Sequence, residues 1–304
     1  MEKIIKKRIS KKGHTMKEYI YHDVNLRGTI EKVSYRTTNR DGQVRMKRCN
    51  VYLPCGYDPE KTEKRYDILY LVHGGGGSQD AWLDCCKIKN MLDYTIDTGE
   101  IDLLIVVFPC FYKEQISRIG PPDADVEKAH VLLFIQELAE ELLPAVEGRY
   151  HTWSDGGSRD ALVCSRSHRA VGGFSMGSCT AWFTFLNHLD LFSRFVPLSG
   201  DCWAVKPMGG KSHPAETAET LRNAVLQSAY TPDDFRIFAA TGSKDPACNA
   251  LGPQIEAMKA FPDTFRFSDD FSTGNAHYFL REGSEHCYEH VMQYLYNYLP
   301  VLFS

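Results

Sequence analysis

The feature that most constrains the fold is a series of short, continuous apolar segments, each ending in glycine, proline or a polar turn. A stretch with helical periodicity follows each segment. Strands that helices cover on both faces have this uninterrupted apolar character, so the segments predict buried parallel strands. The predicted strands are residues 67–73, 103–109, 169–174, 195–199, 235–241 and 277–282.

The stretches between these strands predict helices. The predicted helices are residues 126–146, 178–189, 215–228, 252–261 and 287–299. Residues 200–214 are the longest stretch without clear periodicity in the second half of the chain, and we expect them to form a loop over a site.

Two stretches near the amino terminus alternate apolar and polar residues. They read GTIEKVSYRTT, from Gly28, and QVRMKRCNVYLP, from Gln43, and the turn-forming sequence Asn39-Arg40-Asp41-Gly42 separates them. This pattern predicts an antiparallel hairpin. The hairpin and the alternating units together predict an α/β protein with a doubly wound, mostly parallel sheet and an antiparallel N-terminal hairpin.

The length of 304 residues and a hydrophobic content of 43% are sufficient for one large core. We therefore expect residues 17–304 to form a single domain. Residues 1–16 are polar and basic without periodicity, and we expect a flexible arm there.

Charge and composition exclude several classes of protein. The net charge of −4 gives no global positive field for nucleic acid or an anionic membrane surface. The longest apolar run, residues 103–108, is too short to span a bilayer, and the basic amino terminus lacks the apolar part of a secretion signal. We therefore expect a cytoplasmic protein, unless a signal peptide has been removed. The ten cysteines form no CxxC pair, so we expect reduced thiols and no metal site or other cofactor.

The strongest motif is Gly173-Phe174-Ser175-Met176-Gly177, which matches G-x-S-x-G. It lies between a predicted strand and a predicted helix, which is the context that a nucleophilic serine at a sharp turn requires. Small flanking residues let the strained chain pass without a clash, and the helix amino terminus stabilises negative charge. The motif therefore predicts Ser175 as a nucleophile.

A glycine run follows the first predicted parallel strand, in the sequence His73-Gly74-Gly75-Gly76-Gly77. Esterases carry a similar H-G-G-G segment, whose backbone amides form an oxyanion hole. We expect the amides of Gly75 and Met176 to form this hole. A phosphate-binding loop is the alternative, but the chain has neither GxGxxG nor a Gly-Lys-Ser/Thr ending at this point.

The acid and the base of a triad are expected after later strands, in the order serine, acid, histidine. Asp201 and Asp245 both lie just beyond apolar strands, and we favour Asp245 because it follows the penultimate strand. His286 lies between the last strand and the terminal helix, where the histidine is expected. His277 and His290 are expected to be structural.

These residues predict an ester hydrolase of the α/β-hydrolase fold that works through an acyl-enzyme. The histidine would accept the serine proton during attack and return it to the leaving alcohol, and the aspartate would hold the imidazole tautomer. His73 is expected to brace the oxyanion loop.

From residue 28 onward the chain resembles the feruloyl and related esterases of carbohydrate esterase family one, in the esterase D branch of the α/β-hydrolases. The resemblance rests on Tyr52-Leu53-Pro54, residues 73–82, residues 172–177, Ser199-Gly200-Asp201, residues 241–245 and residues 283–286. It implies release of ferulate-type acids from arabinoxylan oligosaccharides.

Aromatic residues near the motifs fit a pocket for an aryl acyl group. We expect Trp82, Tyr112 and Trp203 to bind substrate, together with Asp201 in the loop at residues 200–214. Each aromatic residue can instead belong to the core. The expected ligand is an aryl ester, either a small molecule or an oligosaccharide, and a homodimer is possible.

Two alternatives keep the same triad, an acetylxylan or acetyl esterase and a thioesterase of the S-formylglutathione hydrolase type. A third alternative is a catalytically inactive binding protein. Such proteins usually lack a triad member, whereas all three positions are filled here.

Overall fold

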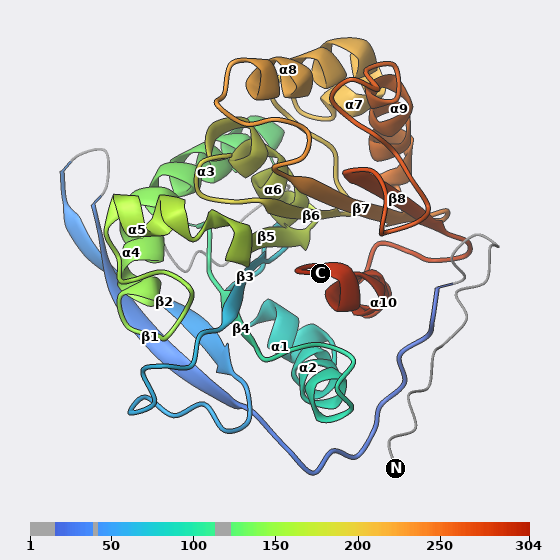
Figure 1. Cartoon of the computed structure of the whole chain (residues 1–304). Coiled ribbons are helices and arrows are strands. Elements are labelled where there is room, and N and C mark those ends of the chain that lie inside the picture. Colours follow the sequence, from blue (N-terminus) through green and yellow to red (C-terminus); the bar gives the residue numbers. More distant parts are fainter. Residues whose placement is uncertain (1–15, 39–41, 113–122) are drawn as a thin grey trace.

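The computed structural model describes residues 16–38, 42–112 and 123–304. Within these residues eight strands form one sheet in the order β1-β2-β4-β3-β5-β6-β7-β8 (Figure 1). Their bounds are β1 (Thr29–Thr38), β2 (Val44–Leu53), β3 (Asp67–Val72), β4 (Leu104–Phe108), β5 (Arg169–Phe174), β6 (Arg194–Leu198), β7 (Arg236–Gly242) and β8 (Ala276–Arg281). The six predicted parallel strands are confirmed, and none of their ends differs from the predicted end by more than one residue.

The predicted N-terminal hairpin is also confirmed. β1 pairs with β2 in antiparallel register from Thr29 opposite Leu53 to Thr38 opposite Val44, and β2 pairs antiparallel with β4. All the other strand pairs are parallel. The predicted turn residues 39–41 lie outside the described residues.

The helices that the structure describes include the five that the sequence predicts. Their bounds are α1 (Ala81–Cys85), α2 (Ile88–Asp97), α3 (Ala124–Glu137), α4 (Leu143–Glu147), α5 (Arg159–Cys164), α6 (Met176–Asn187), α7 (Gly209–Ser212), α8 (Pro214–Leu226), α9 (Cys248–Met258) and α10 (Tyr288–Tyr298), with short 3-10 turns at Arg166–His168 and Leu299–Val301. The sequence pattern did not predict α1, α2, α5 and α7. No helix within the described ranges is both long and apolar enough to cross a membrane.

The helix predicted at residues 126–146 consists of α3, a π-helical turn (Leu138–Leu142) and α4. At the turn the N–H of Leu143 donates to the carbonyl of Leu138, five residues back. Pro144 follows at once, and proline has no N–H to continue the regular helical pattern. The π-helical turn therefore lies directly before the point where proline interrupts the helical hydrogen bonds.

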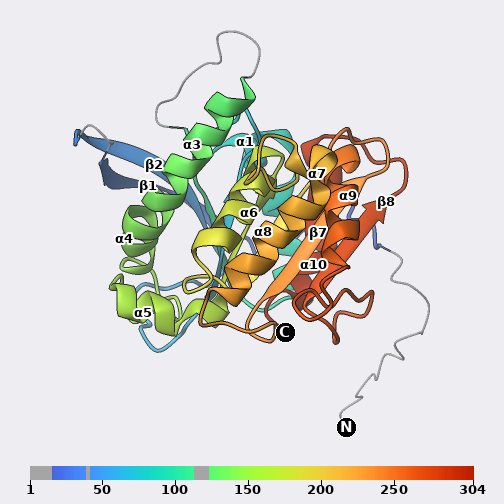
Figure 2. The ribbon, with the colours of Figure 1, turned by 90° about the horizontal axis from the view of Figure 1, so that it is seen from above.

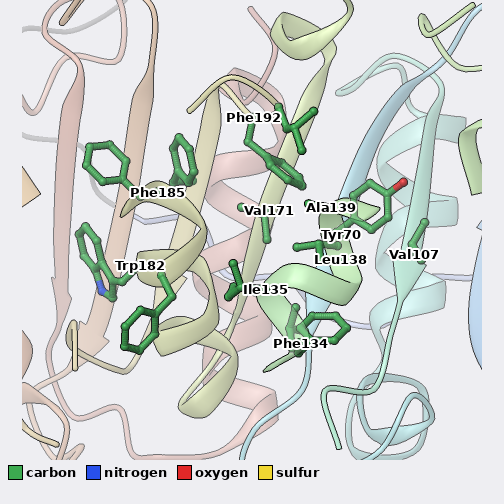
Figure 3. Packing of buried hydrophobic residues seen from close by; sticks show 14 of the residues in the cluster. Tyr70, Val107, Phe134, Ile135, Leu138, Ala139, Val171, Trp182, Phe185 and Phe192 are labelled. Atoms are coloured by element: carbon green, nitrogen blue, oxygen red, sulfur yellow. The ribbon is translucent and has the colours of Figure 1, made fainter. Parts of the chain in front are cut away.

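The sheet lies between two layers of helices. Figures 1 and 2 show α3, α6 and α8 on one face and α1, α2 and α10 on the other. Side chains of β3 alternate between the two cores, so that Tyr70 and Val72 face the first layer and Leu69 and Leu71 face the second. Figure 3 shows the first core, in which Phe134 and Ile135 of α3 pack near Val171 of β5.

The segment before β1 is attached to the second layer. The N–H of Tyr19 donates to Gln293 Oε1 at 2.7 Å, and the N–H of Lys17 donates to Asn297 Oδ1 at 2.8 Å. Both acceptors belong to α10. The chain is therefore docked from about residue 16, and residues 1–15 of the predicted arm lie outside the described residues.

The carboxyl ends of the parallel strands share one edge of the sheet. The glycine loop follows β3, Ser175 follows β5, Asp245 follows β7 and His286 follows β8. Parallel pairing thus brings residues that are far apart in the sequence to one place.

Candidate active site

Ser175 occupies a sharp turn between β5 and α6. Its φ of 58° and ψ of −111° lie in a region that residues with a side chain enter only at a cost in conformational energy. The N–H of Ser175 donates to the carbonyl of Leu198 at 3.0 Å, which fixes the turn to β6. The hydroxyl is partly exposed beside the amino terminus of α6.

The glycines around this serine are required by close backbone contacts. A Cβ at Gly173 would lie 2.5 Å from the carbonyl oxygen of Val72, and a Cβ at Gly177 would lie 2.3 Å from the same atom. A Cβ at Gly200 would lie 2.6 Å from the carbonyl oxygen of Ser175. The G-x-S-x-G spacing therefore lets the turn pass close to β3 and β6.

Ser175, His286 and Asp245 form a chain of hydrogen bonds. Ser175 Oγ lies 3.0 Å from His286 Nε2, and His286 Nδ1 lies 2.8 Å from Asp245 Oδ1. The Asp245 carboxylate is buried, whereas the His286 side chain is 34% exposed. This arrangement can remove a proton from the serine hydroxyl, because the carboxylate holds the proton on Nδ1 and leaves Nε2 as an acceptor.

Asp245 is held by its own loop. Its Oδ1 also accepts the N–H of Ala247 at 2.8 Å. No described residue donates to its buried Oδ2. The carboxylate is therefore fixed by local backbone and directed at the imidazole.

Within the described residues, three of the four amides of the glycine loop have a partner and one has none. The N–H of Gly74 donates to Tyr288 Oη at 2.9 Å, the N–H of Gly76 donates to Tyr112 Oη at 2.6 Å, and the N–H of Gly77 donates to the Gly74 carbonyl at 3.1 Å. No described residue accepts the N–H of Gly75.

The Gly75 amide lies beside the first residue of α6. A Cβ at Gly75 would lie 3.3 Å from Met176 Cγ. Met176 is the first helical residue, so its N–H has no partner within the helix. The two residues predicted as oxyanion donors, Gly75 and Met176, thus lie side by side, and their role as donors stays a prediction.

His73 is a neutral brace of the glycine loop. Its Nδ1 lies 2.7 Å from the Gly74 carbonyl and its Nε2 lies 3.3 Å from Cys110 Sγ. Burial lowers the pKa of His73 to about 4. The neutral ring therefore donates from Nδ1 and accepts the Cys110 thiol proton at Nε2, which matches the expected structural role.

A family model named Esterase, with the description "Putative esterase", matches residues 44–293. The chain belongs to this family. Solved structures with which it superposes are esterases of the α/β-hydrolase fold, and the mostly parallel sheet found here agrees with that fold.

Two curated proteins are similar to this esterase. Endo-1,4-beta-xylanase Y of Acetivibrio thermocellus is 37% identical over 277 residues, which are 91% of this chain and 23% of that protein. An endo-1,4-beta-xylanase/feruloyl esterase of Xylanibacter ruminicola is 27% identical over 274 residues, which are 86% of this chain and 31% of that protein. The esterase spans less than a third of the length of these relatives.

One solved structure matches nearly the entire chain. It is a serine-to-alanine mutant of the feruloyl esterase module from Clostridium thermocellum, complexed with sinapinate. It is 36% identical to the esterase with a TM-score of 0.79, and the match covers 97% of this chain and 96% of that chain.

Two of the four predicted substrate residues of the esterase lie in the interior. Trp82 is 1% exposed, and its indole N–H donates to the Val72 carbonyl at 3.1 Å. Tyr112 is 8% exposed, and its hydroxyl contacts the Gly76 amide and the Glu127 carboxylate. Both side chains are buried with their polar atoms bonded to protein groups, and their role in substrate binding stays a prediction.

The other two predicted residues form a pair in the loop after β6. Asp201 Oδ1 accepts the indole N–H of Trp203 at 2.9 Å, and Asp201 Oδ2 accepts the N–H of Gly210 at 2.8 Å. Burial raises the pKa of Asp201, and these two hydrogen bonds oppose the rise. Asp201 therefore holds the indole of Trp203, which is a partly exposed residue.

The predicted loop at residues 200–214 contains the short helix α7 at its end. It is also anchored from the opposite helix, because Lys128 Nζ of α3 donates to the Ala204 carbonyl at 3.1 Å. The loop that carries Trp203 is thus held at the neighbouring residue, Ala204.

The remaining histidines near the site are engaged elsewhere. His277 is buried, with Nδ1 2.8 Å from the Ser268 carbonyl, and His290 Nδ1 accepts the N–H of Glu285 at 2.7 Å. Neither is hydrogen-bonded to Ser175.

Two aromatic residues beside His286, Phe174 and Tyr288, were not predicted to belong to the surroundings of the site. The Phe174 ring lies 4.5 Å from the His286 ring and 4.8 Å from the Tyr288 ring. Their positions in the sequence could have indicated this, because Phe174 directly precedes Ser175 and Tyr288 comes two residues after His286.

Proposed function

We propose that this protein is a feruloyl esterase, a serine carboxylic-ester hydrolase that releases ferulate-type acids from arabinoxylan oligosaccharides. The observation that carries the proposal is the hydrogen-bonded chain of Ser175, His286 and Asp245 at the carboxyl edge of the sheet. It is supported by similarity to proteins that are described as a xylanase and as feruloyl esterases.

The first half of the reaction forms an acyl-enzyme. Ser175 Oγ attacks the ester carbonyl carbon while His286 Nε2 accepts the hydroxyl proton. The Asp245 carboxylate stabilises the imidazolium that results. Collapse of the tetrahedral intermediate breaks the bond to the leaving alcohol, which takes the proton from His286.

The second half releases the acid. Water enters in place of the alcohol, His286 removes its proton, and the hydroxide attacks the acyl carbon. The bond to Ser175 Oγ breaks and the serine recovers its proton.

In both halves the carbonyl oxygen carries negative charge. The N–H groups of Gly75 and Met176 stabilise it, and removing one such donor costs about 3 kcal/mol in well-studied hydrolases. The amino terminus of α6 adds a favourable dipole at the same point.

Trp203 supplies the specificity for an aryl acyl group. Its ring is partly exposed and held by Asp201, so it offers a flat surface whose orientation is fixed before binding. Stacking on a cinnamoyl ring requires such a surface. An acetyl group would gain nothing from it, which separates the feruloyl esterase from an acetyl esterase.

The test compares hydrolysis of methyl ferulate and p-nitrophenyl acetate by the wild type and by Ser175→Ala at neutral pH. Ser34→Ala, at an exposed position of β1, is the control. The proposal requires that the wild type and the control cleave both esters and that Ser175→Ala cleaves neither. Cleavage of the acetate alone would leave an acetyl esterase or a thioesterase, which S-formylglutathione would distinguish.

The predicted cytoplasmic location and the predicted homodimer stay predictions. Cell fractionation tests the first. Size-exclusion chromatography with light scattering tests the second, since a dimer has twice the mass of 34.5 kDa.

A further inference from the structure

In the glycine loop, two tyrosine hydroxyls accept the amides on either side of Gly75. Gly74 donates to Tyr288 and Gly76 donates to Tyr112, whereas Gly75 donates to no described residue. We propose that the hydroxyls of Tyr112 and Tyr288 are positioning groups, which keep the Gly75 N–H directed at the acyl oxygen. This inference rests on the proposed function, because it requires an acyl oxygen beside the nucleophile.

The direction of the Gly75 N–H is set within its own peptide unit. The carbonyl of that unit belongs to Gly74, and it accepts the N–H of Gly77 at 3.1 Å and lies 2.7 Å from His73 Nδ1. In a trans peptide the N–H points away from the carbonyl. Two donors on the carbonyl therefore direct the Gly75 N–H to the opposite side.

Tyr288 fixes the beginning of the loop. Its ring packs edge to face against Trp82 at 5.0 Å and Phe174 at 4.8 Å, so the hydroxyl that accepts from Gly74 has a defined position. Burial raises the pKa of Tyr288 to about 12, and the hydroxyl stays neutral. Because Tyr288 comes two residues after His286, one side chain connects the loop to the segment that carries the base.

Tyr112 fixes the far side of the loop. Its hydroxyl donates to Glu127 of α3, whose two carboxylate oxygens lie 2.7 and 2.9 Å away, and accepts the N–H of Gly76 at 2.6 Å. A hydroxyl that donates to a carboxylate is a stronger acceptor at its own oxygen. Glu127 thus strengthens the bond that holds Gly76.

The flexibility of the loop makes these bonds important for catalysis. Glycine peptides reorient at little cost, so Gly75 would otherwise sample several N–H directions. A donor stabilises the transition state well only when it is oriented before the reaction. Loss of either hydroxyl should therefore lower kcat and leave KM nearly unchanged.

The test uses Tyr112→Phe, Tyr288→Phe and the double variant, which keep the packed rings. Tyr298→Phe is the matched control, because the buried Tyr298 hydroxyl donates to the Ala239 carbonyl at 2.6 Å, away from the loop. We measure kcat and KM with p-nitrophenyl acetate, inhibition by a trifluoromethyl ketone analogue of ferulate, binding of free ferulate, and melting temperature.

We expect kcat to fall about tenfold in each single variant, below the loss of about a hundredfold for a deleted donor. The ketone, which forms an oxyanion on the serine, should weaken by a similar factor, whereas KM and ferulate binding should change less than twofold. The control should keep the wild-type kcat. A wild-type kcat in both loop variants would overturn the proposal, as would parallel losses of kcat and ferulate binding.

Glu127→Gln gives a second measurement if Tyr112→Phe does not fold. Its amide oxygen still accepts the Tyr112 proton, so we expect a smaller loss of kcat than about tenfold. An equal or larger loss would contradict the role given to the hydroxyl. Failure of the proposed function is recognised separately, because Ser175→Ala would then keep activity on the acetate ester, or the wild type would leave methyl ferulate uncleaved.

Discussion

His286 Nδ1 lies 2.8 Å from Asp245 Oδ1, so a buried carboxylate holds a partly exposed imidazole. The same carboxylate oxygen accepts the N–H of Ala247 at 2.8 Å, which fixes it in its loop. The choice of Asp245 over Asp201 as the acid therefore has a geometric basis, because Asp201 instead receives Trp203 and Gly210.

Asp245→Asn should lower kcat for p-nitrophenyl acetate by about 10³ to 10⁴ while the fold is retained. The amide has nearly the same shape as the carboxylate but does not stabilise the imidazolium, and it favours the wrong tautomer of His286. Steady-state kinetics and circular dichroism check this result. Asp263→Asn, at an exposed salt bridge with Arg222, should behave as the wild type. A loss below tenfold in Asp245→Asn would show that another group supports His286.

The turn at Ser175 gives a prediction on stability. In Gly177→Ala the new Cβ would lie 2.3 Å from the Val72 carbonyl oxygen, and β3 cannot move because it is paired on both sides. We expect a loss of about 3 kcal/mol or more in the free energy of unfolding. Urea unfolding monitored by fluorescence measures it.

Gly99→Ala is the control for this experiment. Gly99 has a φ of +68° and no atom within 4 Å of its Cβ position, so the substitution adds backbone strain without a clash. A loss of about 1 kcal/mol is expected, with normal activity. A loss in Gly177→Ala no larger than that in Gly99→Ala would show that the contact with the Val72 carbonyl does not require glycine at position 177.

His73 gives a prediction on pH. Its pKa is lowered from 6.5 to about 4 by burial, so the unfolded chain binds a proton in this range and the folded chain does not. Stability therefore falls as the pH drops from 6.5 toward 4, and the loss from this residue is about 2 kcal/mol at pH 5.

The measurement compares the free energy of unfolding of the wild type and His73→Asn at pH 7 and pH 5. Asparagine can donate to the Gly74 carbonyl but does not titrate, so the variant should lose less stability between the two values of pH. Burial also lowers the pKa of His188 and His277, and both remain in the variant. The same pH dependence in both proteins would exclude His73 as a source of acid sensitivity.

The fold was predictable from the sequence because each buried strand is one apolar run. Residues such as 68–72 alternate between two cores and are apolar on both sides, and this pattern requires helices on both faces. Ser175, Asp245 and His286 were predictable because each follows a strand, and parallel strands end at one edge.

The surroundings of the site were less predictable, because proximity in sequence does not give exposure. Trp82 and Tyr112 lie close to the glycine loop in the structure but are buried, and their polar atoms bind backbone groups and a carboxylate. Tyr288 was missed because nothing in a helical pattern shows that a hydroxyl reaches the Gly74 amide, which is 214 residues away in the sequence.

The proposed aryl specificity rests on Trp203. Its indole N–H is held by Asp201 at 2.9 Å and its ring is partly exposed, so removal of the ring should not disturb the triad. Trp203→Ala should raise KM for methyl ferulate about tenfold, which corresponds to the loss of about 1.4 kcal/mol of aromatic contact. The KM for p-nitrophenyl acetate and its kcat should stay within about twofold of the wild type, because the acetyl group does not reach an aryl pocket.

Trp153→Ala is the matched control, since this tryptophan is 49% exposed and stacks on His168, away from the triad. The two variants are compared by steady-state kinetics on both esters. Asp201→Leu adds an independent test, because it removes the acceptor of the Trp203 indole N–H and keeps the ring. If Asp201 positions Trp203 for the acyl group, this variant should also raise the KM for methyl ferulate. Unchanged discrimination between the two esters in Trp203→Ala would place the aryl pocket elsewhere on the carboxyl edge of the sheet.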